Sequence, residues 1–463
     1  MLTQTSTHSA SARILPAVCM VLLAMGCLCS AAAGSKHRIR SVRTVPLDFA
    51  PPERSDAIDI SKQGTLLVFP WGLTKIRAHV EDRKARRLQY RILVEQMKTQ
   101  THVQGRKVLR EPGLLVWDYQ RQRSAFEFPP NDDWAQWENK APESLRGDWQ
   151  FRFQGDGSRI VGIQTPWLVL IDVKKQVEIG RVLPSESYLR KDSPGRPSLW
   201  VGVRICHLAI DPQNGSVAAA YNVGRDTHLY VYDSDLKRQI ASWQLPRMVR
   251  DLCWSPDGKK LAVLFHGRFE EKRKLVSGYS FVTSQEPDMW IMDPHSREPL
   301  VRFWTGSSQD QVAFSRDSNL IYVTNDYLYL SPPAHKGAMR VFSAVSGALL
   351  QTISAGPKGV HSGFSLSPDG SLIAADASTY VPQGLHMEPI PFEKISRVVL
   401  LDAKTGDLLF EHHERTSGYI WNPLGLAFSP DGRLLFVDFP RSQKQPYQRI
   451  EVYSIDDSNG AKH

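Results

Sequence analysis

Four side chains with metal-binding and proton-transfer chemistry stand together at Glu411 to Glu414, where the sequence reads Glu-His-His-Glu. Imidazole and carboxylate groups are ordinary zinc ligands. Neighbouring residues of a β-strand point to opposite faces, however, so His412 and His413 cannot chelate one ion unless the backbone bends between them. We therefore interpret these four residues as solvated turn residues and expect no metal site.

The remaining residues with catalytic chemistry are dispersed along the chain. His207, His266, His335 and His386 belong to different segments and could meet only at a shared opening. Carboxylates such as Asp310 would suit glycosidase or lactonase chemistry, but no pair stands at a diagnostic spacing. The sequence has no Gly-x-Ser-x-Gly elbow, no His-Glu-x-x-His helix and no phosphate-binding glycine loop. We expect no catalytic residues and no cofactor.

Length and composition limit the folds that could position these residues. The chain has 463 residues, of which 41% are hydrophobic and 10% aromatic, and it contains 30 prolines. This length would suit two or three average domains, but an all-β propeller can use it as one unit. The formal net charge of +9 would suggest nucleic acid. The export signal described next argues against that partner, and we expect none.

The N-terminus has the pattern of a secretory signal. Arg13 precedes an apolar run, Ile14 to Gly34, that ends in Ala-x-Ala. We expect cleavage after Ala33, so that residues 1–33 are a signal peptide and the mature chain has no stable transmembrane span. The protein would then be exported to the periplasm, the cell envelope or the medium. Lipid attachment at Cys27 and an uncleaved anchor are the alternatives.

A tetrapeptide, Ser-Pro-Asp-Gly, recurs at Ser255, Ser367 and Ser429, each time between two apolar runs. Proline presets φ for the second turn position, Asp tolerates the third, and Gly takes the left-handed position that follows. Each copy therefore predicts a β-hairpin whose strands we name a and b. Weaker copies surround Ser61, Gln154, Asp211 and Ser315.

A second pattern, an apolar strand followed by a tight turn and another strand, follows each hairpin and predicts strands c and d. The residues that open these turns are Asp118, Asp172, Asp233, Asp293, Ser343 and Asp402. Seven units of four antiparallel strands predict an all-β fold, a single seven-bladed β-propeller. The last unit ends at Arg449 to Asp457 without a strand d, and Arg38 to Ala50 predicts the N-terminal strand that closes the ring.

These units resemble the repeats of WD40-like and TolB-type propellers, and Tyr322 to Asn325 (Tyr-Val-Thr-Asn) resembles the YVTN family of surface-layer propellers. The resemblance covers residues 38–457 and leaves a C-terminal tail, 458–463. It implies the fold and leaves the function open, because such families share repeats and differ in task. Trp117-Asp118 is the only Trp-Asp pair in the sequence, so the polar network of true WD40 blades is not expected.

Two cysteines, Cys206 and Cys253, remain after signal cleavage. A disulfide between them is compatible with an exported protein. Aligned on the repeat, however, they stand three positions out of step and therefore on opposite strand faces. This offset favours two buried free thiols.

The longest insertion, at about residues 71–112, falls between strands b and c of the first unit. It carries eleven Lys or Arg against four Asp or Glu. Such a segment suits docking onto an acidic surface through Arg83, Lys84, Arg86 and Arg87, or it is a solvated flap on blade 1. Further b–c insertions are expected at Gly267 to Pro287, Asp326 to Lys336 and Thr379 to Ser396.

In propellers of this type the b–c and d–a connections emerge on one face. Trp200 and Trp421 lie in d–a connections, where amphipathic rings suit peptide or sugar recognition. Arg204, Arg250 and His361 fall near the starts of strand a and so near the mouth of the channel. These five residues and the four basic residues of the insertion are the candidate binding residues.

Two functions follow from these features. The first is an exported, non-catalytic propeller that binds a protein or an acidic cell-envelope component through this face. The second is a propeller hydrolase or lyase that acts on a sugar, lactone or peptide in the central channel.

Overall fold

The computed structural model describes residues 37–47, 59–62, 66–71, 113–118, 121, 123–128, 150–164, 167–183, 203–223, 226–265, 269–275, 278–283, 287–296, 298–306, 309–325, 338–354, 363–380, 393–417, 425–439 and 448–457. Ile39–Ile455 form one compact unit. That unit contains every described strand except the first two residues of the first strand and the last two of the last.

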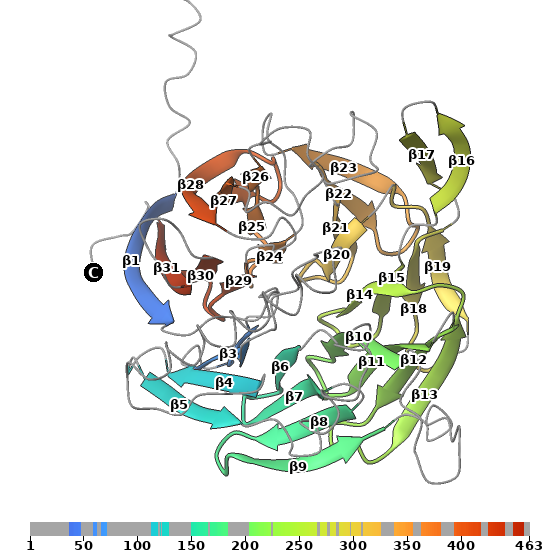
Figure 1. Ribbon diagram of the computed structural model, residues 1–463, viewed down its shortest axis with the longest axis horizontal. Coiled ribbons are helices and arrows are strands. Elements are labelled where there is room, and N and C mark those ends of the chain that lie inside the picture. The colour runs from blue at the N-terminus through green and yellow to red at the C-terminus, as the bar shows by residue number, and fades with distance from the viewer. Residues whose placement is uncertain are drawn as a thin grey trace, which may run out of the picture. The chain divides into compact units, whose positions relative to one another are not determined.

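Apart from one separate two-stranded hairpin, the described strands form seven antiparallel sheets in the predicted a–b–c–d order (Figure 1). Blades 1 to 3 consist of β2 (Asp59–Ile60), β3 (Leu66–Trp71), β4 (Gly113–Asp118) and β5 (Arg123–Phe128); β6 (Phe151–Gln154), β7 (Arg159–Gln164), β8 (Trp167–Asp172) and β9 (Val177–Val182); and β10 (Val203–Ile210), β11 (Val217–Val223), β12 (Asp226–Tyr232) and β13 (Gln239–Leu245).

Blades 4 to 6 continue the pattern with additions. They consist of β14 (Val249–Trp254), β15 (Leu261–Phe265), β18 (Met289–Met292) and β19 (Pro299–Phe303); β20 (Gln309–Phe314), β21 (Leu320–Asn325), β22 (Ala338–Ser343) and β23 (Leu349–Ser354); and β24 (Phe364–Leu366), β25 (Leu372–Asp376), β27 (Glu393–Asp402) and β28 (Leu408–Ser417). A separate hairpin, β16 (Phe269–Leu275) and β17 (Gly278–Thr283), occupies the Gly267 to Pro287 insertion. The Thr379 to Ser396 insertion is shorter than expected, because β26 (Thr379–Tyr380) pairs with β27, which already begins at Glu393.

Blade 7 confirms the predicted closure by the N-terminal strand. Its sheet has the order β1 (His37–Leu47), β31 (Gln448–Asp457), β30 (Leu434–Phe439), β29 (Gly425–Phe428). The Arg40 Nε donates to Ser454 Oγ at 3.2 Å, and the Ser41 hydroxyl donates to Glu451 Oε2 at 3.3 Å. The first described strand therefore supplies the outer strand of the last blade.

The inner strands close the ring. Each strand a contacts strand a of the next blade, and β29 of blade 7 contacts β2 of blade 1; the strands in this cycle are β2, β6, β10, β14, β20, β24 and β29. The seven-bladed, all-β propeller predicted from the repeat is thus confirmed.

Apolar side chains fill the spaces between blades. In β11, Val217, Ala219 and Tyr221 enter the core shared with blade 2, whereas Ala218 and Ala220 enter the core shared with blade 4. All five are fully buried. Since successive side chains of a strand point to opposite faces, a strand that lies between two cores reads as a continuous apolar run. Burying each larger side chain contributes about 1.5–3 kcal/mol.

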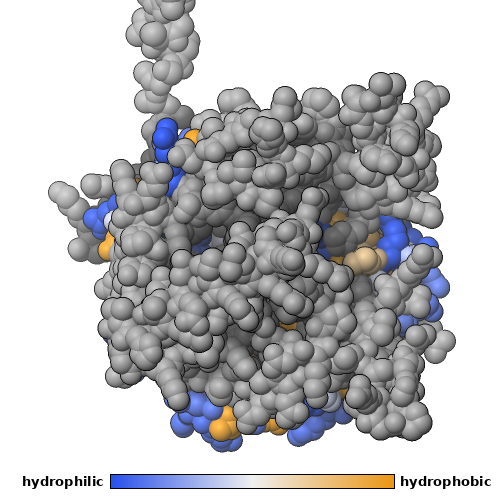
Figure 2. Space-filling view, in the orientation of Figure 1, coloured by the Kyte–Doolittle hydropathy of each residue, from blue (hydrophilic) through white to orange (hydrophobic). Residues whose placement is uncertain are grey.

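The outer strands carry mixed surfaces instead. In β9, Val177 and Ile179 are exposed beside charged neighbours. Figure 2 shows hydrophilic and hydrophobic residues mixed along the edge of the molecule where Figure 1 places β9. Single exposed apolar residues of this kind are normal on a folded protein.

The Ser-Pro-Asp-Gly turn holds itself together through its first residue. The Ser255 hydroxyl donates to Asp257 Oδ1 at 2.6 Å and accepts from the Lys260 N–H at 2.8 Å. Gly258 has a φ of +69°, the left-handed conformation that the tetrapeptide predicts. In the weaker copy at Ser315, Ser318 takes the same position with a φ of +61°. The weaker copy therefore forms the same turn as the full tetrapeptide, with serine in place of glycine.

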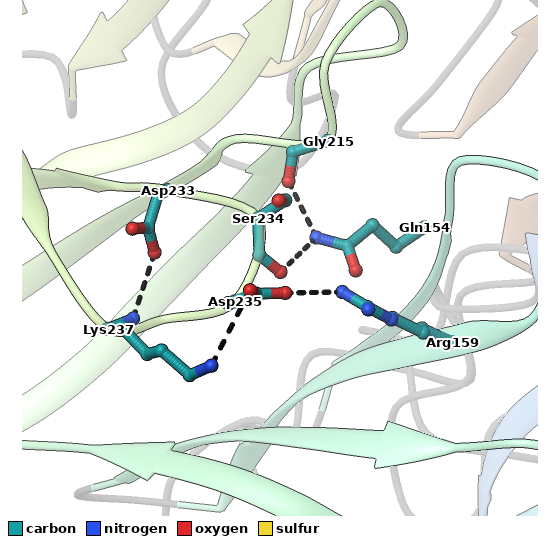
Figure 3. Close-up of polar contacts among 7 residues, drawn as sticks. All are labelled: Gln154, Arg159, Gly215, Asp233, Ser234, Asp235 and Lys237. Carbon is teal, nitrogen blue, oxygen red and sulfur yellow. Dashed lines mark hydrogen bonds and ion pairs between the residues drawn. The ribbon is translucent and has the colours of Figure 1, made fainter.

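These turns also interlock neighbouring blades (Figure 3). The Gln154 amide nitrogen donates to the carbonyl oxygens of Gly215 and Ser234, at 2.6 and 2.8 Å. Arg159 pairs with Asp235 at 2.6 Å. An a–b turn and a c–d turn of blade 3 therefore both bond to blade 2. We name the end of the propeller that carries these turns the turn end.

Deletion of residues 35–50 tests the closure. We expect the shortened protein to lose its cooperative thermal unfolding transition, because blade 7 would lose its outer strand and expose the edge of β31. Deletion of residues 458–463 is the matched control and should leave the transition unchanged. Equal melting temperatures for the full chain and the 35–50 deletion would contradict this account of closure.

Candidate functional site

Long connections leave the propeller from the end opposite the turn end. Every a–b and c–d connection is a short turn, whereas the long ones join b to c or d to a. Examples run from Trp71 to Gly113, from Phe128 to Phe151 and from Val182 to Val203. We name this the loop end.

Most of the predicted binding residues belong to these connections and lie outside the described residues. They are Trp200, His361, Trp421, Arg83, Lys84, Arg86 and Arg87. Two others lie on described strands: Arg204 is in β10, opposite Asn222, and Arg250 is in β14, half-buried. The basic insertion therefore falls in the β3–β4 connection, and the nine candidate residues stay predictions.

In several blades, one polar side chain near the loop end of strand a bonds to strand a of the next blade, and the sequence analysis missed this. The residue stands four positions before the residue that opens the a–b turn, and we name this place in the strand the clasp position. Gln150 Oε1 accepts the Leu208 N–H at 3.2 Å. Asp251 Oδ2 accepts the Val312 N–H at 2.9 Å, and Gln311 Oε1 accepts the Phe364 N–H at 2.8 Å. Each bond runs from one blade to the next.

Asp251 is the centre of this chain of contacts. In blade 3 the clasp position is His207, whose Nδ1 lies 3.6 Å from Asp251 Oδ1. The Leu252 N–H also donates to Oδ1, at 2.9 Å. One carboxylate thus contacts blades 3, 4 and 5. The side chains of His207 and Asp251 are 20% and 22% exposed, so solvent reaches this pair.

The clasp position changes character in the last two blades, where it is Gly363 in blade 6 and Gly425 in blade 7. Glycine has no side chain to bond to the next blade. The clasp therefore runs through blades 2 to 6 and provides no side-chain bond from blade 6 to blade 7.

A second polar cluster lies between blades 4 and 5 at the loop end. Asp288 is the residue before β18, where the connection that contains β16 and β17 returns to the blade. Its carboxylate accepts the Thr305 N–H at 2.6 Å and the Thr305 hydroxyl at 2.9 Å. Arg340 of β22 donates to the Thr305 carbonyl. The Phe265 N–H donates to the Asp288 carbonyl at 2.8 Å, so the two ends of the connection are joined.

Burial dominates the electrostatics of this cluster. It raises the pKa of Asp288 from its usual value to about 7, although the Thr305 hydrogen bonds and the charge of Arg247 favour the carboxylate. Burial also lowers the pKa of Arg340, which the nearby Asp288 charge raises in part. A carboxyl group with a pKa near neutrality is a common feature of functional sites and also of structural networks.

The interpretation of Glu411 to Glu414 as turn residues is wrong, because all four lie in β28. Their side chains alternate as a strand requires. His412 is half-buried against Phe439 and Tyr453, whereas the side chain of His413 is 67% exposed. Among the described residues, no group of three His, Cys, Asp or Glu side chains could hold a metal ion. His266, His335 and His386 lie outside the described residues.

Cys253 is a free thiol, and burial raises its pKa to about 12. Its side chain packs against the core between blades 4 and 5. A thiol with so high a pKa is a poor nucleophile at neutral pH, so Cys253 serves packing. In the part of the chain that the structure describes, no helix is long and apolar enough to cross a membrane.

Replacing Asp251 tests the clasp. We expect Asp251→Ala to lower the free energy of unfolding by about 2–3 kcal/mol, because two backbone N–H groups lose a charged acceptor. Asp251→Asn should cost less, because an amide oxygen still accepts. Lys404→Ala, on an exposed turn, is the control and should stay within about 0.5 kcal/mol of the native protein in urea unfolding. If Asp251→Ala lowers the free energy of unfolding no more than the control does, the Asp251 contacts do not stabilise the ring.

Replacing Asp288 tests the buried carboxyl. The unfolded chain loses the Asp288 proton near the usual pKa of 3.8, whereas the folded protein keeps it to about 7. Stability relative to Asp288→Asn should therefore rise as the pH falls from 7 to 5, by about 2 kcal/mol. The measurement is urea unfolding of both proteins across this range. Parallel pH profiles would contradict the raised pKa.

Comparison with known proteins supports the fold. No protein-family model matches the sequence, and no curated protein matches it. The β-propeller domain of Cps50 (Swd1) from Myceliophteria thermophila aligns with a TM-score of 0.51 at 12% identity, over 90% of this chain and 100% of that one. A chain in a crystal structure of the mitotic checkpoint complex aligns with a TM-score of 0.49 at 13% identity, over 99% of this chain and 98% of that one.

Hydrazine synthase of Kuenenia stuttgartiensis aligns less well, with a TM-score of 0.43 at 18% identity, over 64% of this chain and 74% of that one. Identities this low concern the fold alone. Together with the closed ring of seven sheets, the similarity to the Cps50 (Swd1) propeller shows that this chain is a β-propeller structurally similar to WD40 propellers.

Proposed function

We propose that this protein is an exported, non-catalytic β-propeller that binds a protein or an acidic component of the cell envelope through its loop end. The observation that carries the proposal is the division between the two ends. The turn end consists of short turns bonded from blade to blade, whereas the long connections all leave from the loop end. WD40-like propellers commonly serve as protein-interaction scaffolds.

Export rests on the sequence of residues 1–33, and the likeness to TolB-type and YVTN propellers agrees with it. The basic insertion between β3 and β4 supplies the charge for an acidic partner, with eleven Lys or Arg against four Asp or Glu. Attraction between such a segment and an acidic surface weakens as salt rises, because exposed charges are screened within about 8–10 Å.

The alternative, a hydrolase or lyase in the channel, draws on the His207–Asp251 pair. A carboxylate beside an imidazole can orient it as a proton acceptor. Here, however, each oxygen of Asp251 already accepts a backbone N–H, one from its own blade and one from blade 5. The carboxylate is therefore committed to joining blades, and the geometry favours a binding protein.

A charge-reversal experiment tests the proposal. The mature protein and a variant with Arg83, Lys84, Arg86 and Arg87 changed to Glu are immobilised and incubated with cell-envelope extract at low and high salt. We expect the native protein to retain a partner at low salt and the variant to lose it. A second variant reverses the charge of four exposed turn-end residues and should behave as the native protein: Lys174, Arg238, Lys259 and Lys404.

The outcomes separate the hypotheses. A partner retained by all three proteins at both salt concentrations would move binding from the insertion to other connections, such as those with Trp200 and Trp421. Loss of the partner in the turn-end variant alone would place binding at the opposite end. Absence of any partner would contradict the scaffold and favour the channel enzyme.

A further inference from the structure

His412 lies at the boundary between blades 6 and 7, which we name the closing seam. It projects from β28, the outer strand of blade 6, onto blade 7. Its ring meets Phe439 of β30 at a centroid distance of 5.4 Å and an angle of 72°, and it lies 5.8 Å from the ring of Tyr453 in β31. Phe439 and Tyr453 are both almost fully buried, so His412 forms part of the apolar contact between the blades.

A chain of polar contacts leads from the same face of β28 to the N-terminal strand. Glu414, two residues after His412, pairs with Arg449 of β31. The Arg449 Nε also donates to Glu451 Oε1 at 2.7 Å, and Glu451 accepts the Ser41 hydroxyl of β1. The guanidinium lies over the ring of Phe439, at 5.1 Å. The packing of β28 and the attachment of β1 therefore share one buried arginine.

The closing seam depends on these contacts because the inner clasp is missing there. Gly363 and Gly425 occupy the clasp position in blades 6 and 7. What joins the two blades is their apolar core together with the contacts of β28 and β31. A change in the charge of one side chain in this contact therefore acts on the closure of the ring.

Four ionisable groups act on His412. The carboxylates of Glu414 and Glu451 favour its protonation, whereas Arg449 and the neighbouring His413 oppose it. Burial outweighs the carboxylates and lowers the pKa of His412 below its usual 6.5. The imidazole is therefore neutral in the closed structure at pH 7, and its protonated form prefers the solvent that it would meet if β28 separated from blade 7.

We propose that the closing seam is a proton-sensitive device: protonation of His412 loosens the packing of β28 on blade 7 and, through Arg449 and Glu451, the attachment of the N-terminal strand β1. The direction follows from linkage. The opened form binds a proton at the ordinary histidine pKa and the closed form binds it only at lower pH, so closure is lost as the pH falls through about 6.5.

Hydrogen exchange of the β1 amides in the full chain tests this device. Exchange at Ile39–Val42, corrected for the intrinsic effect of pH, is compared at about pH 7.5 and 5.5. We expect opening of β1 to increase at the lower pH, by up to about tenfold per unit between the two pKa values. The amides of Val161–Ile163 in β7 of blade 2 are the internal reference and should change less.

Two single substitutions decide whether His412 is responsible. His412→Gln should remove the increase, because glutamine does not titrate. His413→Gln, which replaces the exposed neighbour, should keep it. If His412→Gln does not fold at pH 7.5, His412→Phe replaces it, because phenylalanine fills the apolar site without a charge.

Three results would overturn the proposal. The first is an equal pH response in the native protein and the His412 variant. The second is a response that disappears in His413→Gln. The third is equal opening of β1 and β7 in the native protein, which would mean that acid loosens the whole propeller rather than the closing seam.

Discussion

Packing between blades is the constraint on which the rest of the structure depends, because the blades share their cores with their neighbours. In β11, alternate side chains serve the cores on either side, and the fully buried strand β15 does the same in the next blade. A sheet of this kind cannot bury its apolar faces alone. It needs a neighbouring blade on each side, so the last blade must pack against the first and the ring must close. The pairing of β1 with β31 satisfies this requirement.

Two kinds of polar contact add to the apolar cores between blades, and different boundaries of the ring use different kinds. At the turn end and along the inner strands, Gln154, Asp251 and Gln311 join consecutive blades through bonds to main-chain groups. Between blades 6 and 7 the clasp position holds a glycine, Gly363, and the ion pair between Arg449 and Glu414 joins the two blades instead. Bonds to backbone N–H groups do not depend on histidine protonation, whereas His412 sits inside the ionic part. On the proposal above, this difference makes the boundary between blades 6 and 7 sensitive to histidine protonation.

The sequence predicted the fold wherever the signal is local. A turn such as Ser255 to Gly258 is specified by four adjacent residues, so the hairpins, their number and the missing outer strand could all be read from the chain. The clasp could not be recognised in the same way, because Gln150 and Leu208 meet only in the folded ring. A polar residue four positions before several turns was nevertheless a visible signal. Asp288 gave no signal, since its environment comes from blade 5 and from a connection of unpredicted path.

The candidate site was less predictable than the fold for a physical reason. Most of the predicted binding residues stand in long connections, which no repeat specifies. The error at Glu411 to Glu414 has the same origin: the repeat predicts where an outer strand starts but not that β28 continues for ten residues. Its charged side chains then serve contacts within blade 6, as when Arg397 pairs with Glu411, and between blades, as when Glu414 pairs with Arg449.

The pairing of the first described strand with the last has a consequence for biosynthesis. Arg40 and Ser454 are separated by 414 positions. At about 5–20 residues per second, a ribosome needs roughly 20–80 s to make the chain between them. During that interval β1 has no partner strand, and no intermediate length of chain can form a closed ring. The nascent propeller therefore stays open until β31 has been made.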